Sequence, residues 1–303
     1  MRRTLAAVVL AVVGCSAPAP AQQTPPAFNG QRAFADLKAM VDIGPRPSGS
    51  PAIDKTRDYI RTQLKAAGLT PVDQAFDADT PSGRTHMVNI RATLPGQVSG
   101  KGRIVIGGHY DTKPFKEFAF VGASDAASSA AFLLEMARAL KGRQNALPIE
   151  LLFLDGEEAV CKDWDECNKP GNPDHTYGSR YYAQQAKKDG TARDVRAFIL
   201  VDMIADRDLD ISRESNSTPW LTDAIWSTAR RLNRPEFLQQ AMPIEDDHLE
   251  FLEVGIESVD IIDLDYPAWH TAADDLQHVS PKSLQAVGDV VVAALPLIET
   301  RLK

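Results

Sequence analysis

Short apolar stretches alternate with helical patterns along most of the chain, and this alternation limits the choice of fold. The strand-like stretches are residues 86–93, 103–108, 149–154, 198–202 and 259–264. The helical patterns cover residues 29–41, 51–67, 126–141, 176–188, 219–232 and 280–302. Strands that alternate with helices are typical of a parallel sheet whose faces are covered by those helices. The pattern predicts an α/β fold of three layers, with a central, mostly parallel twisted sheet flanked by helices.

The first residues have the composition of an export signal. Arg2 and Arg3 precede an apolar run from Leu5 to Val13, which is too short to span a bilayer. Two cleavage sites compete: a lipoprotein signal ending at Cys15, which we slightly favour, and an ordinary site after Ala21 that would leave Gln22 first. We therefore expect an exported protein, either periplasmic, anchored through lipid at Cys15, or secreted.

The remaining length fits one domain, and nothing in the composition indicates nucleic acid as a partner. We assign residues 1–21 to the signal, 22–28 to a linker and 29–303 to a single domain, which we expect to be monomeric. The net charge is -8, and positive charges occur only as short pairs. Such a chain offers no basic surface for nucleic acid or an anionic membrane.

Two cysteines lie close together in a polar loop at residues 161–175. In an exported protein, Cys161 and Cys167 favour a local disulfide, and one pair at this spacing is a poor zinc site. Two free buried thiols remain the alternative.

Three acids directly follow the apolar strand 151–154. Asp155, Glu157 and Glu158 flank Gly156, and neighbouring carboxylates repel unless a cation or a proton separates them. One acid can then bind a metal while its neighbour transfers protons. Taken alone, the segment is equally well explained as a solvated acidic turn.

Other potential ligands stand at the ends of the remaining strands. His109 closes one strand, and Asp111 is placed to orient its imidazole. Asp125 opens a helix, Asp202 ends a strand, and His270 follows the last strand. Each has an ordinary structural explanation, but together they supply the nitrogen and oxygen ligands that zinc takes.

From about Phe34 onward, the order of these motifs resembles the co-catalytic zinc aminopeptidase family, and within it the animal-type glutaminyl-peptide cyclotransferases. The matching segments are residues 108–111, 122–125, 155–158, 177–180, 202 and 269–271. In the resemblance, Asp125, Glu158 and His270 hold one zinc ion. His109 and Asp202 complete a second zinc site in the aminopeptidase branch.

The segment 244–248 favours the cyclotransferase branch, because Asp246 matches an extra acid found there, which shares a proton network with the counterpart of Asp202. Trp164 and Trp269 match the tryptophans that wall the cyclotransferase pocket. Asp260 stands where the animal enzymes have a histidine, and we expect it to contact substrate. The loop 159–176 is longer than expected, and residues 205–220 look more like bacterial aminopeptidases.

The resemblance implies an acyltransferase that converts the N-terminal Gln of peptides or proteins into pyroglutamate with one zinc ion. Glu157 would transfer the proton, and Asp202 with Asp246 would bind the leaving nitrogen. The alternative is an exported aminopeptidase with two zinc ions. A zinc-bearing binding lipoprotein without turnover ranks last, because Glu157 is present.

Overall fold

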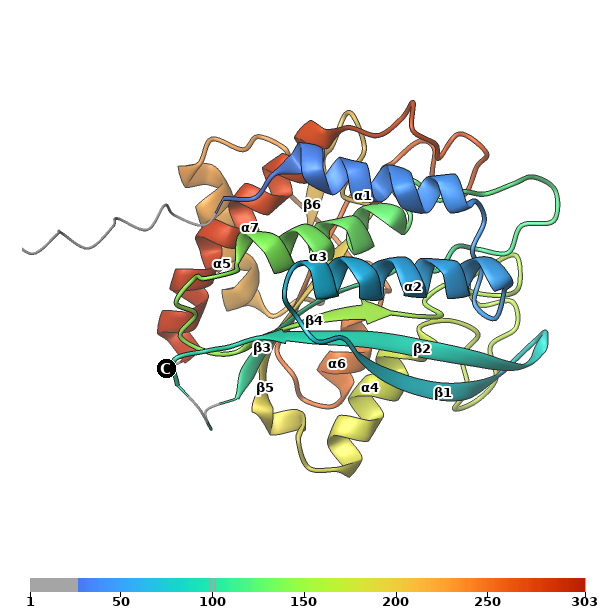
Figure 1. Cartoon of the computed structure of the whole chain (residues 1–303), viewed down its shortest axis with the longest axis horizontal. Helices are drawn as coiled ribbons and strands as arrows, with labels where there is room; N and C mark the ends of the chain where they lie inside the picture. Colours follow the sequence, from blue (N-terminus) through green and yellow to red (C-terminus); the bar gives the residue numbers. More distant parts are fainter. Residues whose placement is uncertain (1–26, 99, 101, 303) are drawn as a thin grey trace, which may run out of the picture.

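A computed structural model describes residues 27–302, apart from residues 99 and 101 (Figure 1). The export signal, both cleavage sites and most of the linker lie outside the described residues and stay predictions.

The main sheet has six strands, and most of its pairings are parallel. They are β1 (Val72–Thr80), β2 (Gly83–Leu94), β3 (Arg103–His109), β4 (Ile149–Leu154), β5 (Val195–Asp202) and β8 (Ser258–Ile262). The order is β1-β2-β4-β3-β5-β8. β1 and β2 pair antiparallel, as do β2 and β4, whereas the pairs β4–β3, β3–β5 and β5–β8 are parallel. The predicted mostly parallel sheet is confirmed.

Helices cover both faces of this sheet and make the three layers (Figure 1). One face carries α1 (Gly30–Ile43), α2 (Pro51–Ala66), α3 (Ala127–Ala139), α5 (Pro219–Arg231) and α7 (Pro281–Leu302). The other carries α4 (Tyr177–Lys188) and α6 (His248–Glu253), which pack Tyr182 and Phe251 against Phe198. Every residue of β4 is buried, because both of its faces are covered.

Some elements lack a hydrophobic signal, and the sequence analysis missed them. β1 is a sheet-edge strand whose residues are mostly exposed and polar. β6 (Ile211–Glu214) and β7 (Phe237–Met242) form a separate two-stranded sheet, and a 3₁₀ turn covers Ala192–Asp194. Such strands are held by pairing with their neighbours, which a single stretch of sequence does not show.

The carboxyl ends of β4, β3, β5 and β8 meet at one edge of the sheet because these strands are parallel neighbours. His109 and Asp202 are the last residues of β3 and β5, and the acidic turn begins directly after β4. The edge therefore collects most of the polar residues that the sequence analysis selected.

Candidate metal centre and pocket

The acidic turn after β4 is shaped by one glycine and one aspartate. Gly156 has a φ of 74°, and a Cβ there would lie 2.6 Å from the Met87 sulfur, so the turn requires glycine. Asp111 accepts hydrogen bonds from the backbone N–H groups of Gly156 at 2.9 Å, Glu157 at 3.2 Å and Glu158 at 3.4 Å. Its Oδ1 also lies 3.5 Å from His109 Nδ1, so Asp111 contacts both the predicted imidazole and the turn, and its short hydrogen bonds go to the turn.

Asp125, Glu158 and His270 come together at the pocket, and we call them the open ligand group. His270 Nε2 lies 3.4 Å from Asp125 Oδ2 and 3.4 Å from Glu158 Oε2. One ligand atom from each residue lies within 4.8 Å of the others. Ligand atoms around a tetrahedral zinc with bonds of about 2 Å are about 3.3 Å apart, so this donor set fits zinc.

His109, Asp125 and Asp202 form a second cluster of ligand atoms within 4.8 Å, the closed ligand group. His109 Nε2 is 3.3 Å from Asp125 Oδ1 and 3.1 Å from Asp202 Oδ1. Asp202 Oδ1 also accepts from Met203 N–H at 2.8 Å and from the Ser129 hydroxyl at 3.3 Å. The two oxygens of Asp125 thus face different groups, as a residue shared by two metal sites would.

Negative charge is concentrated at the open ligand group. Burial alone would lower the pKa of His270, but the adjacent Glu158 and Asp125 carboxylates raise it to about 10. Burial and the Asp125 charge raise the pKa of Glu158. A divalent cation would relieve this repulsion, which is the second reason that these residues fit a zinc ion.

Asp125 is held in place by an aspartate that the sequence analysis missed. Asp274 accepts hydrogen bonds from the backbone N–H groups of Ser124 at 2.7 Å and Asp125 at 3.0 Å, and from the Tyr266 hydroxyl at 2.9 Å. Its position four residues after His270 is the one local signal that could have indicated it.

A cluster of acids lies beside the ligand groups. Glu157, Asp202 and Asp246 line the pocket, and all three are buried. Burial raises the pKa of Glu157 well above its usual value, with the charges of Glu158 and Asp246 adding to the effect. Burial also raises the pKa of Asp246, and Asp260 and Asp202 contribute. Glu157 and Asp246 can therefore hold protons at neutral pH, as groups that give and take protons must.

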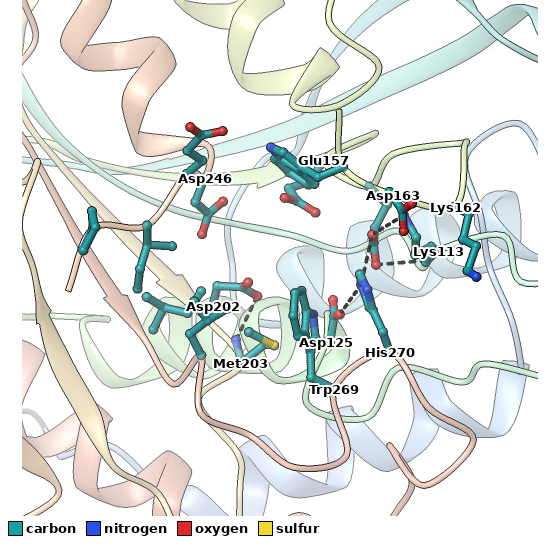
Figure 2. Close-up of a pocket in the computed structure, with 17 residues that line it drawn as sticks. Lys113, Asp125, Glu157, Lys162, Asp163, Asp202, Met203, Asp246, Trp269 and His270 are labelled. Atoms are coloured by element: carbon teal, nitrogen blue, oxygen red, sulfur yellow. Dashed lines mark hydrogen bonds and ion pairs between the residues drawn. The ribbon is translucent and has the colours of Figure 1, made fainter. Parts of the chain in front are cut away.

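The pocket has a volume of about 430 Å³ and opens over these side chains (Figure 2). Trp164 and Trp269 both line it, and Trp269 stacks on His270 with ring centroids 4.4 Å apart. Asp260 is fully buried and is absent from the residues that line the pocket. Its predicted contact with substrate therefore has no support from the pocket lining.

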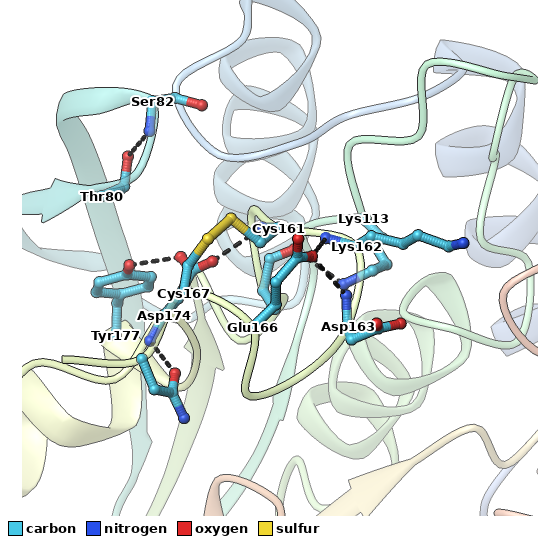
Figure 3. The surroundings of a disulfide bond; sticks show 12 residues. Thr80, Ser82, Lys113, Cys161, Lys162, Asp163, Glu166, Cys167, Asp174 and Tyr177 are labelled. Atoms are coloured by element: carbon cyan, nitrogen blue, oxygen red, sulfur yellow. Dashed lines mark hydrogen bonds between the residues drawn. A yellow bond between two sulfur atoms is a disulfide. The ribbon is translucent and has the colours of Figure 1, made fainter.

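A disulfide closes the loop that carries Trp164 (Figure 3). Cys161 is bonded to Cys167, and the Cys161 N–H donates to Asp174 at 2.9 Å. The Tyr177 hydroxyl donates to the other oxygen of Asp174 at 2.8 Å. The indole of Trp164 stacks on His175 at 4.1 Å, and the indole N–H is buried without a hydrogen-bond partner. The loop is thus a fixed part of the pocket wall.

Comparison with known proteins places this geometry among metal-dependent peptidases and cyclases. The profile of peptidase family M28 matches residues 89–295. A mouse glutaminyl-peptide cyclotransferase-like protein is 32% identical over 283 residues, which cover 82% of this chain and 71% of the mouse protein. A Boiga irregularis glutaminyl-peptide cyclotransferase is 27% identical over 296 residues, covering 81% of this chain and 75% of the snake protein.

Solved structures include relatives of both kinds. The glutaminyl cyclase of an Acidobacteriales bacterium has a TM-score of 0.85 and 37% identity, and the match covers 94% of this chain and 100% of that one. A leucine aminopeptidase precursor from Bacteroides thetaiotaomicron has a TM-score of 0.80 and 26% identity, covering 90% and 98%.

Proposed function

The chain belongs to peptidase family M28, and from this premise we propose that it is a zinc-dependent glutaminyl-peptide cyclotransferase. It converts the N-terminal glutamine of peptides or proteins into pyroglutamate and releases ammonia. The observation that carries this choice is the pocket, where a complete zinc ligand set stands beside three buried acids, Glu157, Asp202 and Asp246.

The open ligand group of Asp125, Glu158 and His270 would hold the zinc ion. Bound there, zinc supplies a Lewis acid for the γ-carboxamide oxygen of the substrate glutamine. Asp274 and Asp111 keep Asp125 and Glu158 in place through their hydrogen bonds to the backbone.

Glu157 transfers the proton that the reaction requires. The substrate's α-amine attacks the γ-carbonyl carbon, so a C–N bond forms within the substrate and the bond to the amide nitrogen breaks. Glu157 takes a proton from the amine and returns it to the departing nitrogen, which leaves as ammonia. Burial and the neighbouring acids, which raise the pKa of Glu157, suit it to both steps.

The remaining pocket residues orient the substrate. Asp202, supported by Asp246, hydrogen-bonds the leaving nitrogen, and Trp269 packs against the glutamine side chain. Trp164 forms another part of the pocket wall.

The experiment that tests this function offers purified, zinc-loaded protein a glutaminyl peptide and an alanyl peptide. We expect loss of ammonia from the glutaminyl peptide, measured by mass spectrometry, and no change in the alanyl peptide. Glu157→Gln should lower the rate of ammonia release by about 10³-fold while the zinc content stays the same.

Aminopeptidase activity is the second candidate, because the closed ligand group supplies the donors of a second zinc site. It predicts release of a free amino acid from either peptide and two zinc ions per chain. The cyclotransferase hypothesis predicts one zinc ion per chain.

We also propose that the protein is exported and monomeric, either lipidated at Cys15 or cleaved after Ala21. The disulfide between Cys161 and Cys167 supports an oxidising compartment. Mass spectrometry of the mature N-terminus would decide between the two cleavage sites. Cleavage after Ala21 would leave Gln22 at the N-terminus, where the enzyme could convert it into pyroglutamate. Recovery of unmodified Gln22 would count against such self-processing.

A further inference from the structure

Arg46 has a completely buried side chain, and the mechanism above does not use it. It lies in the short segment 44–47 between α1 and α2, with Pro45 and Pro47 on either side. This segment precedes residues 89–295, which the family profile matches. An arginine is rarely buried unless its charge and its N–H groups have partners, so the partners of Arg46 indicate what it does.

The buried guanidinium joins two segments that carry predicted zinc ligands. Its Nε–H donates to the Tyr110 carbonyl oxygen at 3.0 Å, and Tyr110 directly follows His109. Its Nη1 donates to the carbonyl oxygen of Val121 at 2.6 Å and its Nη2 to that of Gly122 at 3.0 Å, in the segment that leads to Asp125. One planar fork of donors thus ties the end of β3 to the loop before α3.

The backbone of Arg46 is tied to the first of these segments as well. Its N–H donates to the Thr112 hydroxyl at 3.0 Å, and its carbonyl oxygen accepts from the Thr112 N–H at 3.4 Å. The two segments also pack directly, since a Cβ on Gly122 would lie only 2.8 Å from the Thr112 methyl carbon. Arg46 therefore fills a tight joint between them, where a side chain without a planar fork cannot make the same three bonds.

The positive charge of Arg46 lies among aspartates that hold the site. Burial lowers the pKa of Arg46 to about 10, while the charges of Asp274, Asp111 and Asp125 act against this shift. The guanidinium therefore keeps its charge at neutral pH and offsets part of the negative charge of these carboxylates.

From these contacts we propose that Arg46 is a positioning residue for the zinc site, an inference that rests on the proposed function. It holds the segment that leads to Asp125 against the segment that follows His109. Asp274 binds the backbone of Asp125 itself, and Arg46 binds the residues before it. Without the fork, three carbonyl oxygens lose a donor and the two segments can shift apart. Because Asp125 belongs to both ligand groups, such a shift would weaken zinc binding.

The first test compares Arg46→Lys with the same substitution at Arg143. Lysine keeps the charge but not the planar fork, so Arg46→Lys should raise the zinc dissociation constant about 10- to 100-fold, measured by competition with a fluorescent chelator. Ammonia release should fall in parallel with bound zinc. The Arg143 side chain is also mostly buried, but its Nη2 pairs with Glu299 Oε2 at 2.7 Å and it does not line the pocket. Arg143→Lys should lower the melting temperature and leave the zinc affinity unchanged.

A second measurement reports the geometry of the site without turnover. Cobalt(II) in place of zinc has a visible absorption band that depends on the arrangement of its ligands. We expect this band to be weaker or shifted in Arg46→Lys and the same as in the wild type in Arg143→Lys. If Arg46→Lys does not fold, Thr112→Val takes its place, because it removes the acceptor of the Arg46 N–H with little change of shape. It should raise the zinc dissociation constant about two- to tenfold and shift the cobalt band.

Two results would overturn the inference. One is a folded Arg46→Lys variant, or Thr112→Val where Arg46→Lys does not fold, with the zinc affinity and cobalt spectrum of the wild type. The other is an equal loss of zinc affinity in Arg143→Lys, which would make the effect a general loss of stability. Wild-type protein that binds zinc but releases no ammonia would instead refute the proposed function, and the metal measurements would still test Arg46.

Discussion

The open and closed ligand groups share Asp125 but differ in what surrounds them. All three members of the open group line the pocket, and the His270 side chain is 22% exposed. In the closed group, His109 is absent from the pocket lining and 1% exposed, and Asp202 already accepts three hydrogen bonds. A catalytic zinc keeps one position open for substrate, and only the open group offers this. Residue types alone, which are nearly the same in both groups, do not reveal the difference.

The largest expected effect on activity is the difference between replacing His270 and replacing His109. His270→Ala should remove zinc and lower kcat/KM by at least about 10³-fold, since a metal ion supplies several kcal/mol of transition-state stabilisation. His109→Ala should keep one zinc ion and lose about tenfold in activity. Elemental analysis and ammonia release test both variants together. Equal zinc loss in the two variants would contradict the distinction between the groups.

The pH dependence of zinc binding sharpens the comparison further. In the metal-free protein, Glu158 and Asp125 raise the pKa of His270 to about 10, although burial alone would lower it. Zinc needs the neutral imidazole, so its apparent affinity should rise about tenfold per pH unit, or about 100-fold between pH 7 and 9. Competition with a fluorescent chelator measures this slope.

The raised pKa of His270 also affects the stability of the metal-free fold, which should fall with rising pH whereas the zinc affinity rises. A raised histidine pKa contributes stability that is fully present below the unfolded value of 6.5 and is lost as the pH rises through about 10. The melting temperature of the metal-free protein should therefore fall as the pH rises between these two values. His270→Ala should flatten the curve, and a wild-type curve that is already flat would contradict the assigned shift.

Asp246→Asn tests the acid beside the closed group. We expect kcat to fall about tenfold with one zinc ion retained, because the pocket loses a buried acid that we propose supports Asp202. Unchanged kcat together with a second bound zinc would favour the aminopeptidase. Asp263→Asn is a suitable control, as it replaces another buried acid that does not line the pocket.

The smallest effect should come from the pocket wall. Replacing Cys161 and Cys167 together by serine should cost about 2 kcal/mol of unfolding free energy, since the closed loop is short. KM should rise a few-fold because Trp164 is less firmly held, while zinc content stays the same. Urea unfolding and steady-state kinetics measure the two effects. A change in kcat alone would contradict a role in binding.

Much of the fold was predictable because hydrophobic runs mark the central strands: the strand predicted at residues 149–154 coincides with β4. β1 was missed because its residues are mostly exposed and show no hydrophobic run. Only the structure shows that it pairs with β2. Site residues such as His109 and Asp202 could be predicted because they stand where these hydrophobic runs end. Asp274 was missed because its contact with Asp125 spans 149 positions. The hydrogen bond between Glu214 and His248 joins β6 to α6 across 34 positions, and no local pattern indicates it.

The three backbone bonds to Asp111 also bear on how this segment can change in length. They fix residues 156–158 one by one, so that Glu157 and Glu158 project toward different histidines: His109 at 3.8 Å for the first and His270 at 3.4 Å for the second. Insertion of one residue between Leu154 and Glu157 would move Glu157 into the position of Glu158, and deletion of one would move Glu158 into the position of Glu157. The loop beyond Ala159 is not held by these three bonds and can vary in length, but residues 155–158 must keep their number.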